Sequence, residues 1–318
     1  MKIHIPNSAF LGNIDPFIQG FDPLNEEILE ITANQNWISV HPVVLAMISA
    51  LGLRAEKVKC DKIVATSGHY LERMGLFKFL GLESNMDILA HDPSGRFIPL
   101  SKIKGSSELT KFITEMTPLL HLNPEQSRVI SYIISELVRN VLEHAQASQG
   151  AIVAAQYHKR SNTIRIGIAD TGLGIKKTIN RSYSAKDDLD AIQLALTPGI
   201  TGTTKREGGT EQNAGAGLFF IKSIAHVNRN FFMIYSGQGM YKLLKRKETK
   251  EIKLHADPFV DRHSKEQLMP NWKGTVVGID ISLDVTSEFT QLLDLIRPTY
   301  GEAVRERKKL RYKKAKFI

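Results

Sequence analysis

Apolar and polar residues follow two different rhythms along this chain, and together they predict a protein of the α/β class. Between residues 130 and 142 the apolar positions recur every three or four residues, which predicts a helix with one core-facing stripe. Between residues 163 and 169 apolar residues alternate with others and β-branched types are frequent, which predicts a strand ending at Asp170. Further along, a glycine-rich turn runs into an apolar helix over residues 217–225.

The first hundred residues alternate between short strand-like and helix-like patterns. Strands are predicted at residues 2–6, 28–32 and 62–66, and helices at residues 42–51 and 70–81. This alternation predicts a small α/β domain over residues 1–104, followed after turn-forming residues by a second domain over residues 105–290.

Three polar side chains share one edge of the helix predicted around residues 130–142. Glu136, Asn140 and His144 are spaced four residues apart, so their side chains stack along one side of the helix. A carboxylate can accept a proton from a polarised water or hydroxyl, and an amide oxygen is a suitable ligand for Mg²⁺. A solvated polar face is the plainer interpretation of this helix taken by itself, since charged residues are mostly exposed.

The strand predicted at residues 163–169 ends in a carboxylate followed by glycines at alternate positions, namely Asp170, Gly172 and Gly174. Glycine permits close approach of backbone to a ligand, and a strand holds the carboxylate in place to accept a hydrogen bond from an amine such as that of adenine. The turn before residues 217–225 offers backbone N–H groups to a phosphate. Each motif alone is also compatible with an ordinary turn or a tight loop before a core helix.

The order and spacing of these three motifs over residues 106–285 resemble the GHKL, or Bergerat-fold, ATP-binding family. This family includes gyrase, histidine kinases, mismatch-repair ATPases and anti-sigma-factor serine kinases. The resemblance implies a two-layer α/β sandwich with a mixed sheet, ATP and Mg²⁺ as ligands, and a mobile lid over the triphosphate at residues 176–212. That segment holds glycines, hydroxyls and cations suited to a lid, although an inert long loop is the alternative.

On this resemblance, individual positions acquire expected roles. Glu136 resembles the general base and Asn140 the Mg²⁺ ligand. Asp170 resembles the residue that recognises adenine, and Thr275, on a late strand, is expected near the adenine. The other residues expected around the nucleotide are Arg139, His144, Gly172, Gly174, Ile175, Thr203, Thr204, Asn213, Gly215, Ala216, Gly217 and Leu218. The second glycine motif has one glycine fewer than many relatives, which leaves open which N–H groups reach the phosphates.

The N-terminal domain is similar, more loosely, to the STAS-like fold of anti-anti-sigma factors. The similarity lies in the segments Trp37–Pro42 and Tyr70–Met74. Such domains can be phosphorylated on a serine at the start of a helix, and Ser39 lies near that place. A helix-capping or turn serine is the favoured interpretation, because serine strongly prefers such positions.

Charge is concentrated at the C-terminal end. The chain of 318 residues has a net charge of +9, and residues 305–316 hold eight cations against a single acid. The basic tail over residues 291–318 is expected to be helical, with its terminal charge run solvated and partly frayed. Binding of nucleic acid or of an acidic protein by this tail is the less favoured interpretation.

Other classes of site find no support in the sequence. It contains neither a GxxxxGK[ST] P-loop nor an HExxH zinc motif, and Pro93 and Gly95 argue against a phosphoacceptor helix around His91. A single cysteine, Cys60, excludes an internal disulfide and favours a reducing compartment. No signal region or membrane-spanning apolar stretch is present, so the chain is expected to be cytoplasmic.

Two functions therefore remain open. In the first, the protein is a regulatory ATPase or protein kinase that uses Mg²⁺-ATP, with Glu136 activating the attacking oxygen and a protein as its regulatory partner. In the second, it binds ATP without useful turnover and acts as a nucleotide-gated interaction module for a protein or nucleic acid. The sequence leaves the identity of the partner, and the pairing of two chains as a homodimer, undecided.

Overall fold

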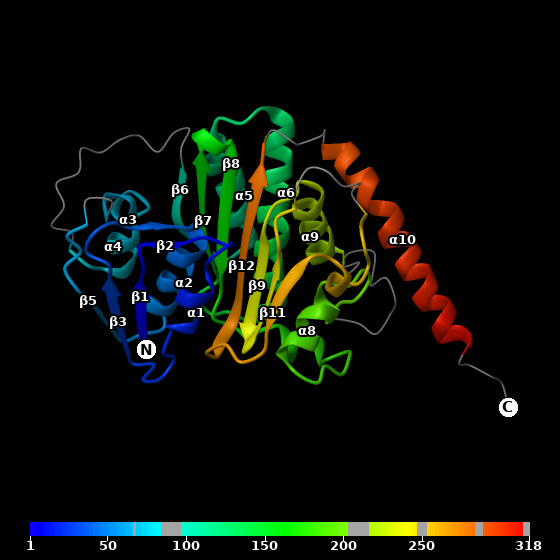
Figure 1. Ribbon diagram of the computed structural model, residues 1–318, viewed down its shortest axis with the longest axis horizontal. Coiled ribbons are helices and arrows are strands. Elements are labelled where there is room, and N and C mark those ends of the chain that lie inside the picture. The colour runs from blue at the N-terminus through cyan, green and yellow to red at the C-terminus, as the bar shows by residue number, and fades with distance from the viewer. Residues whose placement is uncertain (66–67, 84–96, 203–215, 247–252, 284–288, 314–318) are drawn as a thin grey trace.

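The computed structural model describes residues 1–65, 68–83, 97–202, 216–246, 253–283 and 289–313. A seven-stranded sheet runs through the middle of the molecule, and helices cover both of its faces (Figure 1). The strands are β1 (Lys2–Ile5), β2 (Ser8–Ala9), β3 (Ile28–Ala33), β4 (Ser39–Val40), β5 (Lys57–Cys60), β6 (Phe97–Ile103), β7 (Ala151–His158), β8 (Thr163–Ala169), β9 (Phe232–Gly237), β10 (Gly239–Leu243), β11 (His263–Glu266) and β12 (Trp272–Ser282). The helices are α1 (Asp15–Gln19), α2 (Pro42–Gly52), α3 (His69–Arg73), α4 (Leu76–Leu80), α5 (Ser106–Met116), α6 (Pro124–Asn140), α7 (Ile175–Ile179), α8 (Asp188–Ala195), α9 (Gly217–Val227) and α10 (Phe289–Lys313).

The large sheet has the strand order β11-β10-β9-β12-β8-β7-β6, and all of its described pairings are antiparallel. The family resemblance implied a mixed sheet, and this prediction is wrong for these strands, because none of their described pairings is parallel. Two neighbouring pairs, β7 with β8 and β9 with β10, are joined by connections of only a few residues. Such neighbours can pair antiparallel through a short turn, whereas parallel neighbours need a crossover connection.

Helices pack on both faces of this sheet, so the two-layer sandwich implied by the resemblance has a third layer. Helices α6 and α9 cover one face and carry α10 on their outer side, and α2 packs against β7 and β8 on the other face. Two glycines, Gly167 on β8 and Gly278 on β12, lie opposite each other in the pairing register. A Cβ on Gly167 would lie 2.2 Å from the Cα of Val43, so only glycine lets α2 approach this closely.

The N-terminal part contains a parallel three-stranded sheet with the order β1-β3-β5. The predicted strands at residues 2–6 and 28–32 are confirmed, whereas the strand predicted at residues 62–66 is wrong, because the third strand is β5. The helix predicted at residues 70–81 divides into α3 and α4, because Gly75 adopts a left-handed conformation with φ of 78°. Strand β6 precedes the boundary expected at residue 104 and nevertheless forms an edge of the large sheet.

Helix α2 is buried along almost its whole length. The Nδ1 atom of His41 accepts a hydrogen bond from the backbone N–H of Val43 at 3.0 Å and so caps the helix. Ser39 lies in β4, two residues before that cap, so it does not cap the helix. Within the described ranges, no helix combines the length and the apolar composition needed to cross a bilayer.

Candidate nucleotide-binding site

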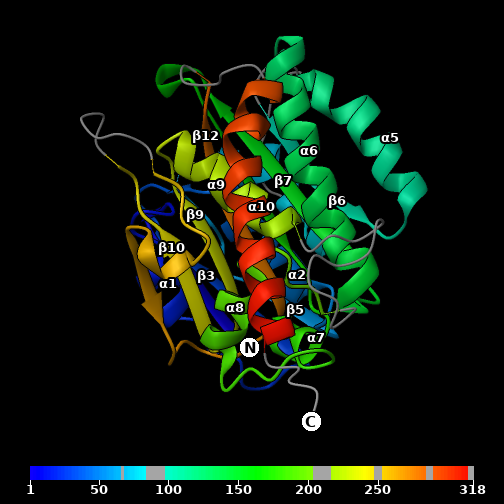
Figure 2. The ribbon, with the colours of Figure 1, turned by 90° about the vertical axis from the view of Figure 1, so that its right-hand side faces the viewer.

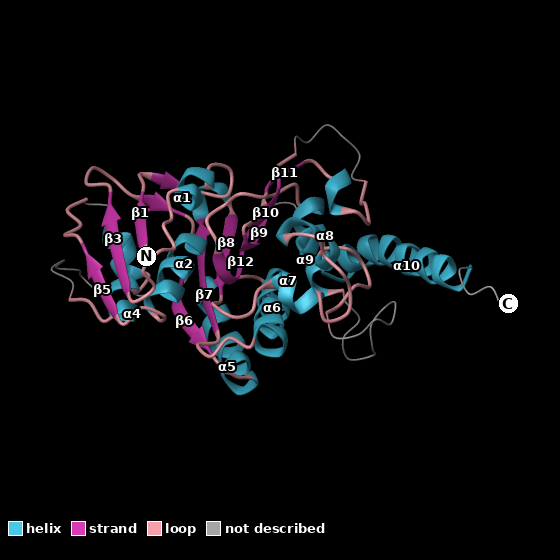
Figure 3. Ribbon diagram, turned by 90° about the horizontal axis from the view of Figure 1, so that it is seen from below, coloured by secondary structure: helices cyan, strands magenta, loops and turns pink. Residues whose placement is uncertain are grey.

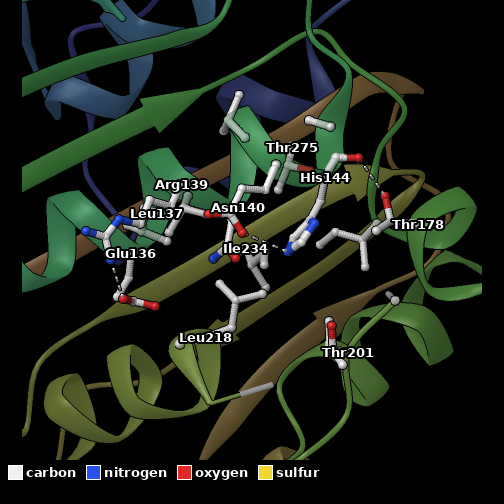
Figure 4. Close-up of a pocket in the computed structure, with 18 of the residues that line it drawn as sticks. Glu136, Leu137, Arg139, Asn140, His144, Thr178, Thr201, Leu218, Ile234 and Thr275 are labelled. Atoms are coloured by element: carbon white, nitrogen blue, oxygen red, sulfur yellow. Dashed lines mark hydrogen bonds and ion pairs between the residues drawn. The ribbon is translucent and has the colours of Figure 1, made fainter. Parts of the chain in front are cut away.

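A cavity of about 350 Å³ lies between α6, the first turn of α9 and the large sheet. Figure 4 shows Glu136, Asn140 and His144 along the α6 side, with Leu218 and Thr201 across from them. The cavity therefore brings together side chains that are more than sixty residues apart in the sequence.

The carboxyl group of Asp170 lies in the cavity wall where β8 ends. The residue is 1% exposed, and its Oδ1 accepts a hydrogen bond from the backbone N–H of Gly172 at 2.7 Å. Its Oδ2 is buried and has no hydrogen-bond partner among the described residues. Burial raises the pKa of the carboxyl to about 7, although the backbone N–H groups of Gly172 and Thr275 oppose this rise. An oxygen in this position is suited to a ligand that donates a hydrogen bond.

The loop after Asp170 depends on its two glycines. A Cβ on Gly172 would lie 2.2 Å from the carbonyl oxygen of Ala145, and Gly174 has a φ of 77°. The next residue, Ile175, donates its backbone N–H to the hydroxyl of Ser236 at 2.9 Å. The glycines therefore let the loop pack between the end of the α6 segment and the sheet.

The α6 wall begins with a capping box between Asn123 and Gln126. The helix ends at Asn140 and continues as a π turn over Val141–Ala145, which carries His144. The Nδ2 atom of Asn140 is buried and, within the described part of the chain, has no hydrogen-bond partner. The backbone carbonyl of His144 accepts a hydrogen bond from the hydroxyl of Thr178, and burial lowers the pKa of the imidazole.

Glu136 lies where α6 meets α9. A Cβ on Gly217, the first residue of α9, would lie 2.5 Å from Oε2 of Glu136, so this carboxylate is in close contact with the start of that helix. Burial raises the pKa of Glu136, and the guanidinium of Arg139, 3.9 Å away, opposes this rise. Ala216, at the N-cap of α9, makes no side-chain hydrogen bond to the helix. The first turn of α9 therefore presents backbone N–H groups and the positive end of its dipole beside Glu136.

Most of the residues proposed from the sequence lie on this cavity. Those that line it are Glu136, Arg139, Asn140, His144, Asp170, Gly174, Ile175, Ala216, Gly217, Leu218 and Thr275. Gly172 shapes the loop without lining the cavity, and Thr203, Thr204, Asn213 and Gly215 lie outside the described residues.

Sequence reasoning missed several other lining residues. Among them are Tyr132, Glu143, Ile234 and Val277, whereas Thr178 and Thr201 belong to the segment 176–212 that the sequence predicts as a lid. Ile234 and Val277 follow ordinary strand patterns, so nothing in their local sequence separates them from core residues. Glu143 adjoins His144, and its nearness to the predicted polar edge is the one signal that could have found it.

Comparison with known protein families agrees with this site. Residues 105–229 match the family model described as a histidine kinase-like ATPase domain. The matched segment runs from α5 through α9 and includes Glu136, Asn140, Asp170 and the first turn of α9. The match supports a GHKL-type ATPase domain, and with it ATP binding, in this part of the chain. A comparison with curated proteins gave no significant match.

Proposed function

We propose that this cavity binds Mg²⁺-ATP and that the protein passes the γ-phosphate to water or to a protein partner. The observation that carries the proposal is the buried, unpartnered Oδ2 of Asp170 in a cavity that also holds Glu136 against the first turn of α9. The free oxygen of Asp170 suits a nucleobase that donates a hydrogen bond. Glu136 beside the first turn of α9 suits a phosphate chain whose terminal phosphate reacts.

The Asp170 side of the cavity is suited to adenine. Adenine carries an exocyclic amine, which donates a hydrogen bond, where guanine carries a carbonyl oxygen. The unpartnered Oδ2 of Asp170 can accept that bond, whereas an approaching carbonyl oxygen would be repelled. Ile234 and Val277 provide apolar surface for the faces of a ring. We therefore expect ATP to be preferred over GTP.

The other side is suited to a metal-bound phosphate chain. Oxygen ligands suit Mg²⁺, and the amide of Asn140 and the carboxylates of Glu136 and Glu143 all line the cavity. Asn140 would hold the ion, which when bound neutralises charge on the phosphate oxygens. Backbone N–H groups at the start of α9 would bind the phosphates themselves.

Glu136 is the proposed general base. Burial raises the pKa of its carboxyl, which makes it a stronger proton acceptor, and Arg139 nearby favours the ionised form that accepts the proton. In its ionised state Glu136 would take the proton from the attacking water or hydroxyl group. Its contact with Gly217 places that step beside the proposed phosphate-binding turn.

Two finer features belong to the same proposal. Residues 176–212 would act as a lid, and this is supported by Thr201 and Gly202, which lie within that segment and line the cavity. The N-terminal part would act as a STAS-like regulatory unit, and this is supported by its parallel β1-β3-β5 sheet packed with helices.

The test is a time course with γ-labelled ATP and Mg²⁺ that separates free phosphate from protein-bound label. Wild type is compared with Glu136→Gln and Asp170→Asn, with nucleotide binding measured in parallel. We expect Glu136→Gln to bind ATP with a turnover at least about a hundredfold lower, and Asp170→Asn to lose preference for ATP over GTP. Label on protein would identify a kinase and free phosphate an ATPase. ATP binding with no turnover in wild type would favour a nucleotide-gated module, and absence of ATP binding would overturn the proposal.

A further inference from the structure

Helix α10 divides into a packed half and an exposed basic half. Leu292 and Ile296 are buried in the main core, and Tyr300 packs against the rings of Phe219 and Phe220 with centroid distances of 6.2 and 5.6 Å. Figure 2 shows the helix lying across α9 and alongside α6. The first half of α10 is therefore a packed part of the fold, because its apolar stripe completes the core.

In the basic half of α10, the side of the helix that faces the protein is also buried. Ala303 and Val304 are buried, and Arg307 donates a hydrogen bond to the carbonyl oxygen of Pro198 at 2.6 Å. Arg305, Lys308 and Lys309 are exposed. Positions i, i+3 and i+4 share one face of a helix, so these three cations form a single outward stripe. Below, "the basic stripe" means Arg305, Lys308 and Lys309.

The basic stripe stands clear of the rest of the described structure. Figures 1 and 3 both show the C-terminal half of α10 extending beyond the other helices. Glu306 is the only acid from residue 303 to the end of the chain, and four further cations follow the stripe in sequence. A long, stiff partner could therefore lie along this stripe without contacting the body of the protein.

We propose that the basic stripe binds the phosphate backbone of nucleic acid. Phosphate contacts in nucleic-acid complexes are made largely by arginine and lysine, whereas the cores of protein interfaces are depleted in lysine. The stripe spans four residue steps, about 6 Å along the helix axis, which is close to the axial rise over two phosphates of one strand. An amphipathic membrane helix needs a free apolar face, and here Ala303 and Val304 are buried, which leaves Leu310 as the one large exposed apolar side chain among residues 301–310.

The proposal does not depend on ATP chemistry, so its failure and that of the nucleotide proposal can be distinguished. The test is fluorescence anisotropy with a fluorescein-labelled 20-base-pair DNA duplex of random sequence, measured over a series of salt concentrations. The variant Arg305→Gln/Lys308→Gln/Lys309→Gln is expected to bind at least about tenfold more weakly at 0.1 M salt. Its plot of log affinity against log salt concentration should be shallower by about 2 to 3 units.

A matched control removes the same charge at the far side of the molecule. Lys57, Lys59 and Lys62 are exposed on and just after β5, so Lys57→Gln/Lys59→Gln/Lys62→Gln should retain the affinity and salt slope of wild type. Thermal unfolding of both variants checks that each is folded. An equal loss in the two variants would show that only overall charge matters and would overturn the proposal.

Two competitors test the other classes of anionic partner. Polyglutamate at equal charge concentration, and vesicles of phosphatidylserine and phosphatidylcholine, should displace the duplex poorly. Displacement by polyglutamate would assign the stripe to an acidic protein, and displacement by the vesicles would assign it to a membrane surface. Either result, or a wild-type protein that does not bind the duplex at low salt, would overturn the proposal.

Discussion

The indole N–H of Trp272 donates a hydrogen bond to the backbone carbonyl oxygen of Asp170 at 3.0 Å, and both residues are almost fully buried. Trp272 also packs against Tyr235 in the sheet and Phe21 in the N-terminal part. The proposed adenine-recognising carboxylate is thus held from behind by an aromatic cluster that joins the two parts of the chain.

Replacing Trp272 by phenylalanine should weaken adenine recognition. The substitution keeps an aromatic ring but removes the hydrogen bond that holds the Asp170 backbone, which is worth about 1 kcal/mol, or roughly a fivefold change in affinity. Isothermal titration calorimetry with adenosine measures this change. Tyr235→Phe is the control, since the Tyr235 hydroxyl bonds to the carbonyl oxygen of Pro270 and not to Asp170. Equal adenosine affinity in Trp272→Phe and wild type would argue against the positioning role.

Adenosine binding should strengthen as the pH rises from 6 to 8. Because burial raises the pKa of Asp170 to about 7, its carboxyl is mostly protonated at pH 6 and mostly ionised at pH 8. The ionised form is the better acceptor for the amine, so the affinity should rise about tenfold over this range. Adenosine has no phosphate, so calorimetry at several pH values follows the protein group. Asp170→Asn should show weaker and nearly pH-independent binding.

The raised pKa of Asp170 also makes the stability of the ligand-free protein depend on pH. A carboxyl with a raised folded-state pKa binds its proton more tightly in the folded than in the unfolded chain. The ordinary pKa of this carboxyl is 3.8, and the folded-state pKa is about 7. The contribution of Asp170 to the free energy of unfolding should therefore fall as the pH rises from about 4 to about 7. Urea unfolding should show a smaller pH dependence over this window in Asp170→Asn than in wild type.

Adding a single methyl group at Gly217 should impair turnover while the fold is kept. A Cβ there would lie 2.5 Å from Oε2 of Glu136, and a carboxylate at the end of a flexible side chain can move away. Displacing the proposed base should lower the turnover in Gly217→Ala by about tenfold or more, with little change in the melting temperature. Gly301→Ala is the control, because a Cβ at that position in α10 meets nothing within 4 Å. Equal turnover in Gly217→Ala and wild type would contradict the role given to Glu136.

The buried cluster around Asp261 should contribute strongly to stability. The Nζ of Lys222 lies 2.5 Å from Oδ2 of Asp261, and both side chains are fully buried. His226 and His255 contact the other carboxylate oxygen at 3.3 and 3.1 Å. Asp261→Asn would leave the Lys222 ammonium without its counterion, so the free energy of unfolding should fall by about 3 to 5 kcal/mol.

Urea unfolding measures the effect of Asp261→Asn. Asp294→Asn is the control, because the Asp294 and Arg297 pair is exposed on α10, and its loss should change the free energy of unfolding by less than about 1 kcal/mol. A similarly small effect for Asp261→Asn would show that the cluster does not hold the segment after β10 against α9.

The sequence by itself was sufficient for the two elements that position Glu136, Asn140 and Asp170. Strand β8 and the helical segment around Glu136 and Asn140 follow from hydrophobic periodicity, because side-chain direction repeats with a fixed period in each element. Asp170 and Gly174 were identifiable because a strand end and a positive φ each favour particular residue types.

Only the tertiary structure decided how these pieces meet. The hydrogen bond from Trp272 to Asp170 joins residues 102 positions apart, and the local sequence around either residue does not predict the other as its partner. The contact of α2 with Gly167, the entry of α10 into the core and the approach of Glu136 to Gly217 likewise depend on long-range packing. Periodicity shows which face of an element is apolar but not which partner covers it. The antiparallel order of the sheet and its third layer therefore lay beyond the sequence.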